Sequence, residues 1–174
     1  MSNEENIIEI LQDPLKWPSI DRPEFSGKLD EIADDAFSNP DERSCIASVL
    51  IYQQLVEELL KVLLQSCNFL VQARLLPIEI KFSDSDNKMF GRLIEDFKRT
   101  IVVPNKEKII EIANRINYHR IKIAHGLTKR ESLKDLLKSA QEVRDLFEKF
   151  FKYYDDAYDW TRVCLNSLRK SKID

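Results

Sequence analysis

The sequence predicts an all-α fold of one domain, a helical bundle with a long central helix and a long C-terminal helix. Only 3 of its 174 residues are Gly and 6 are Pro, too few for a protein with many tight turns. Leu, Ile, Glu and Lys, most of them strong helix formers, occur in long runs. With 43% hydrophobic and 33% charged residues, the chain has the composition of a soluble globular protein that can bury one core.

The first 38 residues are expected to form two short helices and a Pro-rich cover, while residues 39–170 form the main bundle. Residues 3–12 place apolar side chains at helical spacing, and Pro14 ends this helix because it disfavours helical backbone in the residue before it. The next segment, PLKWPSIDRPEFSG, has three prolines. We expect it to be extended and anchored on the core by Trp17.

Helix-start signals define the next two helices. Ser26 suits the N-cap of a short helix over residues 28–37. In the sequence NPDE at 39–42, the Asn can cap a helix, the Pro suits its first position and the Glu can reach back as in a capping box. Apolar residues then recur on a face wide enough for contacts on two sides, so residues 40–68 are predicted to form the central core helix.

Two further helices are expected in the middle of the chain. After a loop at 77–85, a helix is expected to end near Arg99. Pro104 opens the next helix, whose apolar stripe runs from Ile109 to Leu127 and which Gly126 is expected to cap.

The last predicted helix is long and aromatic. Thr128 and Glu131 form a capping-box pattern, and helical periodicity then continues from Leu133 to Tyr158. Within it, FEKFFKYYDDAYDW holds 7 of the 16 aromatic residues of the chain. This density is typical of a core face together with a dimer face, and a surface that stacks on nucleic-acid bases is the alternative.

The cysteines and the N-terminal sequence indicate a cytoplasmic protein without a membrane partner. Cys45, Cys67 and Cys164 are widely spaced, with no Cys-x-x-Cys and no nearby His, so we expect buried, reduced thiols and no metal site or cofactor. The acidic, polar N-terminus does not resemble a signal peptide, and the apolar run CIASVLIY is too short to span a bilayer.

One segment, residues 113–130, concentrates the basic charge. It contains both histidines and five Lys or Arg residues but no Asp or Glu. Because the whole chain has a formal charge of -3, the rest of the chain carries -3 - 5 = -8. A basic island on an acidic protein favours binding of RNA phosphate. The candidate nucleic-acid-binding residues are Lys122, Lys129 and Arg130, for which solvated charges near a helix end are the alternative.

Helix geometry places Arg120 on the apolar stripe. On an ideal helix it lies about 20° from the middle of the stripe, so it is expected to point inward or at a partner, with Glu57 as a candidate carboxylate. His125 lies about 140° further round the helix. The two side chains can therefore converge only if the helix unwinds near Gly126 or if two chains pair.

The sequence NYHRIKIAHGL resembles the Arg-x4-6-His signature of the HEPN superfamily, with Arg120 and His125 as the motif residues. The resemblance covers residues from about 40 to 155 in helix arrangement. It implies a homodimer that cleaves RNA without a metal, in a toxin or phage-defence system, with an antitoxin or regulatory protein as partner. His125 would act as general acid or base, and Arg120 would stabilise the charge on the phosphate.

The chain departs from that signature at Ile121, where active members commonly carry Asn, Asp or His. His119 or Asn117 could supply a comparable polar group, and without one the domain would bind RNA but not cut it. The same region is also similar to the mannitol operon repressor family, which implies a regulatory and non-enzymatic role.

Overall fold

The computed structural model describes residues 3–82, 85, 88–126 and 132–173. Within these residues the regular structure is helical and contains no β-strand. The all-α class is therefore confirmed, with α3 as the long central helix and α6 as the long C-terminal helix. The elements are α1 (Asn3–Gln12), a 3-10 helix η1 (Pro14–Lys16), α2 (Pro23–Asp35), α3 (Glu42–Leu75), α4 (Phe90–Lys98), α5 (Lys106–Gly126) and α6 (Leu133–Ile173).

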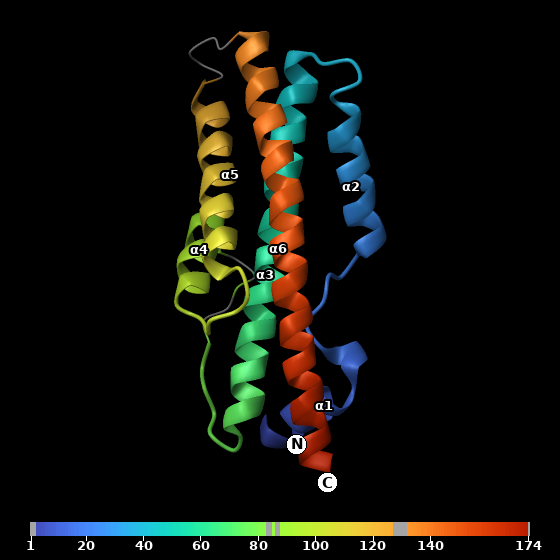
Figure 1. Ribbon diagram of the computed structural model, residues 1–174, viewed down its shortest axis with the longest axis vertical. Helices are drawn as coiled ribbons and strands as arrows, with labels where there is room; N and C mark the ends of the chain where they lie inside the picture. Colours follow the sequence, from blue (N-terminus) through green and yellow to red (C-terminus); the bar gives the residue numbers. More distant parts are fainter. Residues whose placement is uncertain (1–2, 83–84, 86–87, 127–131, 174) are drawn as a thin grey trace.

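The two long helices form the axis of the bundle. Figure 1 shows α3 and α6 side by side and running in the same direction, whereas α2 and α5 run in the opposite direction. Helix α2 packs on α3, α5 packs on α6, and α4 packs on both α3 and α5. The α3 helix thus has neighbours on more than one side, as its wide apolar face predicts. The largest fully buried side chains of the main core include Tyr52, Leu60, Leu63, Phe97, Ile109, Ile116 and Phe150.

The Pro-rich segment contains more helix than expected. Asp13 caps η1 by accepting a hydrogen bond from Leu15 N, so the cover is not wholly extended. Helix α2 begins at Pro23 with Arg22 at the N-cap. The predicted N-cap Ser26 therefore lies inside the first turns of α2, and that prediction is wrong. The physical reason is that proline suits the first helical position, where no N–H donor is needed.

Trp17 anchors the N-terminal cover, as predicted. It is only 2% exposed, and its Nε1 donates hydrogen bonds to the carbonyl oxygens of Ile10 (3.0 Å) and Leu11 (3.2 Å). The Arg162 guanidinium lies 4.9 Å from the centre of its ring. This tryptophan belongs to a second apolar cluster at the end of the bundle where both chain ends lie, made by α1, α3 and α6 (Figure 1).

The N-cap of α3 is Asp41, two residues later than predicted. Ser44 N donates to Asp41 Oδ1 (2.7 Å) and Asp41 N donates to Ser44 Oγ (2.9 Å), which is a reciprocal capping box. Asn39 is therefore not the cap, and Glu42 is the first helical residue rather than the partner of the cap. The short side chains of Asp41 and Ser44 place their oxygens within reach of the two free backbone N–H groups at the start of the helix. The helix continues to Leu75, seven residues beyond the predicted end.

Helix α6 confirms the predicted long aromatic helix. Asp135 N, in the first turn of α6, donates a hydrogen bond to the Oγ of Ser132 (3.3 Å), the residue just before the helix. The predicted capping pair Thr128 and Glu131 lies outside the described residues. Phe150 is buried in the core, which confirms the core face of the aromatic segment; the dimer face stays a prediction.

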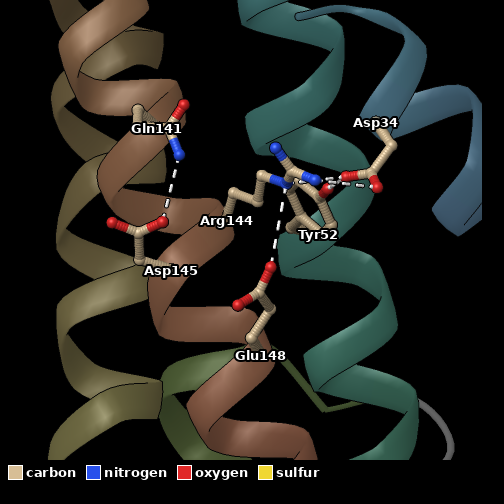
Figure 2. A network of polar contacts seen from close by, with 6 residues as sticks. All are labelled: Asp34, Tyr52, Gln141, Arg144, Asp145 and Glu148. Atoms are coloured by element: carbon tan, nitrogen blue, oxygen red, sulfur yellow. Dashed lines mark hydrogen bonds and ion pairs between the residues drawn. The ribbon is translucent and has the colours of Figure 1, made fainter.

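A polar network holds α2 against α3 and α6, as Figure 2 shows. The Tyr52 hydroxyl donates to Asp34 Oδ1 (2.5 Å), and Arg144 Nε lies 2.9 Å from the same oxygen. Arg144 Nη2 also donates to Asp34 Oδ2 (3.1 Å), and its Nε lies 3.9 Å from Glu148. Burial and the hydrogen bond to Asp34 raise the pKa of Tyr52, so this hydroxyl stays a donor.

The three thiols are free, but they are not equally buried. Cys45 and Cys67 are buried, whereas Cys164 is only half-buried, so the expectation of three buried thiols is wrong for Cys164. Burial raises the pKa of Cys67 to about 12, which keeps it protonated and unreactive. Among the described helices, none combines the length and the apolar character that crossing a bilayer requires.

Candidate functional site

Helix α4 covers only the N-terminal half of α5 (Figure 1). At one end, Lys106 Nζ donates to the carbonyl oxygens of Lys98 (3.0 Å) and Thr100 (2.8 Å), where α4 ends. At the other end, a Cβ placed on Gly91 would lie 3.7 Å from Asn117 Nδ2. The two helices are thus antiparallel, and α5 continues beyond Asn117 without α4 beside it.

Arg120 lies just past this point and is exposed. The prediction that it points inward is therefore wrong: Arg120 lies beyond the part of α5 that α4 covers, although Ile123, further along the same stripe, is still buried in the core. Among the residues that the structure describes, Arg120 forms no ion pair within 4 Å. The second expectation, that it points at a partner molecule, stays a prediction.

The candidate carboxylate Glu57 lies on α3 and is half-buried. Burial raises its pKa, while a hydrogen bond donated by Gln53 Nε2 and the positive charge of Arg120 oppose that effect. Glu57 and Arg120 are thus electrostatic neighbours without a direct ion pair. This arrangement leaves the guanidinium donors of Arg120 available to another anion.

His125 is exposed in the last turn of α5. The helix stays regular through Gly126, so it does not unwind to turn His125 toward Arg120. Regular geometry keeps the two side chains about 140° apart around the helix axis. One chain therefore does not bring them together, and of the two predicted routes to convergence only the pairing of two chains remains.

The other predicted site residues lie in different surroundings. Asn117 is half-buried on α5, beside the start of α4, and Lys122 is exposed on α5. Lys129 and Arg130 lie outside the described residues. His119 is buried, with 8% of its surface exposed.

A pocket of about 530 Å³ lies between α5 and the N-terminal part of α6. Basic, acidic and aromatic side chains of both helices line it. Arg115 Nη2 donates to Glu142 Oε1 (2.7 Å), and His119 Nε2 lies 3.4 Å from the same oxygen. Tyr118, Lys122 and Lys138 also line the pocket.

Glu142 is the charged centre of this pocket. The hydrogen bond from Arg115 lowers its pKa despite slight desolvation, and the neighbouring His119 adds to the effect. Its carboxylate is therefore ionised at neutral pH and holds both α5 side chains. His119 Nδ1 is buried and has no hydrogen-bond partner within the described part of the chain.

The sequence reasoning assigned His119 only a supporting role and did not identify this pocket. One signal was present, since His119 lies three and four residues from the buried Ile116 and Ile123 on the same side of α5. The partner Glu142 had no such signal, because its contact depends on how α5 and α6 are aligned.

The described residues contain no group of three or more His, Cys, Asp or Glu placed to hold a metal ion. Comparison of the chain with protein-family models, with curated proteins and with solved structures gave no match. The resemblance to the HEPN superfamily and to the mannitol operon repressor family thus stays a prediction that rests on the residues themselves.

Proposed function

We propose that the chain is a metal-independent RNA endonuclease that acts as a homodimer, with Arg120 of one copy and His125 of the other in each cleavage site. The observation that carries the proposal is the exposed Arg120, which has no ion pair among the described residues and lies beyond the part of α5 that α4 covers. A guanidinium in that position suits a phosphate supplied from outside the chain.

The exposed apolar residues of α5 support pairing through this helix. Ile121 is 41% exposed and lies between Arg120 and His125 around the helix axis. A partner helix packed on Ile121 would have Arg120 on one flank and His125 on the other. In this proposal the departure from the HEPN signature at Ile121 serves the dimer contact.

The proposed reaction is attack of a ribose 2′-OH on the adjacent phosphorus. The bond between the 2′-oxygen and phosphorus forms, the bond to the 5′-oxygen breaks, and one proton moves from the 2′-oxygen to the 5′-oxygen. His125 would take the first proton or deliver the second, since one imidazole nitrogen can accept a proton and the other can donate one. Arg120 would stabilise the charge on the phosphorane, and the product would carry a 2′,3′-cyclic phosphate.

Labelled RNA incubated with the protein in EDTA tests the proposal. We expect cleavage that falls by about 100-fold or more in His125→Ala and Arg120→Ala, and that is unchanged in Lys149→Ala, an exposed residue of α6 outside the site. Failure to cut every RNA tried, or equal cleavage by His125→Ala protein, would refute it.

Mixing the two inactive variants tests whether the site is shared. Random exchange of subunits places one intact Arg120–His125 pair in each mixed dimer, so activity should return to roughly a quarter of the wild-type value. Absence of any recovery from dimers that do exchange subunits would exclude a site made from two chains.

A second candidate is a non-catalytic helical dimer that regulates or scaffolds a protein partner, such as an antitoxin or a repressor partner. The observation that favours it is Ile121, an apolar residue beside the motif Arg. Sedimentation and salt-dependent binding to RNA and DNA would examine it. A strict monomer would reject both functions.

A further inference from the structure

The pocket between α5 and α6 has the chemistry of a nucleotide site. Three cationic side chains, Arg115, Lys122 and Lys138, line it together with two carboxylates, Asp135 and Glu142. The lining thus has one positive charge in excess, on a chain whose formal charge is -3. An anion with one negative charge, such as a phosphodiester, would balance it.

Both carboxylates are already engaged by the protein. Glu142 accepts from Arg115 and lies beside His119, and Asp135 Oδ2 accepts a hydrogen bond from the Ser132 hydroxyl (2.5 Å). Lys138 is exposed and makes no ion pair within the described ranges. The ammonium group of Lys138 is therefore available to a ligand on the α6 side of the pocket.

The α5 side of the pocket provides an aromatic surface. Tyr118 is 64% exposed, and its ring meets the His119 ring edge to face, with ring centres 5.8 Å apart and planes at 77°. His119 fixes the inner edge of this ring pair, because it is almost fully buried. An exposed tyrosine face held beside basic side chains is the usual platform for a nucleobase.

We propose that this pocket binds one nucleotide of an RNA strand, with its phosphate at Lys138 and Lys122 and its base against Tyr118. The volume of about 530 Å³ is in the range of small-ligand sites. The inference rests on the proposed function in one respect, that the nucleotide is part of RNA.

The pocket lies on the side of α5 that carries His125. Tyr118 and His125 are seven residues apart, so they lie within about 20° of each other around the helix and about 10 Å apart along it. A strand seated in the pocket can therefore continue toward His125, while Arg120 reaches the cleavage site from the second chain. The pocket would thus select the nucleotide next to the cleaved bond.

The test uses His125→Ala protein, which keeps RNA intact and leaves His119 as the only histidine of the chain. Its ring signal in NMR spectra then reports on the pocket alone. Adenosine 5′-monophosphate, uridine 5′-monophosphate and a short RNA are added in turn, and RNA affinity is measured separately. We expect all three ligands to shift the His119 signal.

Two pocket variants and one control complete the test. Lys138→Glu and Tyr118→Leu should each weaken RNA binding about tenfold. Lys149→Glu, which makes the same charge change on the same face of α6 but about three turns beyond Lys138 and outside the pocket, should weaken it far less. Thermal melting of each variant separates loss of binding from loss of folding.

The outcomes distinguish the pocket from the proposed function. If RNA binds, but the His119 signal does not move and the pocket variants match Lys149→Glu, the pocket proposal is overturned while RNA binding stands. If the monophosphates shift the His119 signal but RNA does not bind, the RNA function is overturned, and the pocket binds free nucleotides instead. If no ligand binds, both are overturned.

Discussion

Replacing Asp34 by Ala should destabilise the bundle, because this carboxylate joins α2 to both long helices (Figure 2). The Tyr52 hydroxyl, on a side chain only 1% exposed, would lose its charged acceptor, which costs about 1.5–3 kcal/mol. The ion pair with Arg144 adds less, about 0–1 kcal/mol, because the side chains of Arg144 and Asp34 are 32% and 46% exposed and water screens them. The expected loss is therefore about 1.5–4 kcal/mol in total.

Asp35→Ala is the matched control, since Asp35 is the next residue on α2 and its exposed side chain has no polar contact among the described residues. Both substitutions remove one negative charge from the end of α2, so their helix-dipole effects cancel in the comparison. Urea unfolding followed by circular dichroism gives the two free energies. A double-mutant cycle with Tyr52→Phe should give a coupling of about 1–2 kcal/mol. Equal destabilisation by the two Ala variants would refute the assigned role of Asp34.

Three further predictions concern α5. Ile121→Asp should weaken self-association, because two charges would enter the proposed interface; sedimentation at several concentrations measures this, and an unchanged dimer would exclude Ile121 from the contact. Lys106→Met should destabilise the protein by about 2 kcal/mol in urea unfolding, because two carbonyl oxygens at the end of α4 lose a charged donor. The exposed Lys108→Met should cost less, about 0.5–1 kcal/mol, because it removes only the contact of the ammonium group with the Tyr153 ring (4.8 Å); equal losses would contradict the role of Lys106. Glu142→Gln should remove the stabilisation that the carboxylate gains from Arg115. Because this contact lowers the pKa of Glu142 from its ordinary value of 4.5, the difference in unfolding free energy between the variant and the wild type should be present at pH 7 and vanish as the pH falls below 4.5. A difference that stays constant with pH would contradict this.

The helices could be predicted from the sequence because each buries a face with a regular repeat. Residues 3–12 were predicted with the observed bounds, and α3 and α6 were predicted as the long elements. The helix starts were less predictable. Near Asp41, both Asn39 and Asp41 can act as caps, and the choice depends on which oxygen reaches a free N–H in the folded backbone.

The candidate site was less predictable than the fold. The position of Arg120 on the apolar stripe predicts an inward side chain only if other helices cover that stripe along the whole length of α5. The end of α4 near Asn117 decides otherwise, and no repeat within α5 contains that information. The Arg115–Glu142 pair joins residues 27 positions apart and depends on the alignment of two helices, which a linear pattern does not specify.

The brevity of α4 determines which part of α5 other molecules can reach. It spans nine residues, from Phe90 to Lys98, and its first residues lie beside Asn117. One additional turn at that end would extend it by about 5.4 Å, enough to lie over Arg120. A related chain with a longer helix at this place would have its arginine shielded even if the Arg-x4-His sequence were identical. In such chains the length of this helix, and not the motif alone, would decide whether a phosphate can reach the arginine.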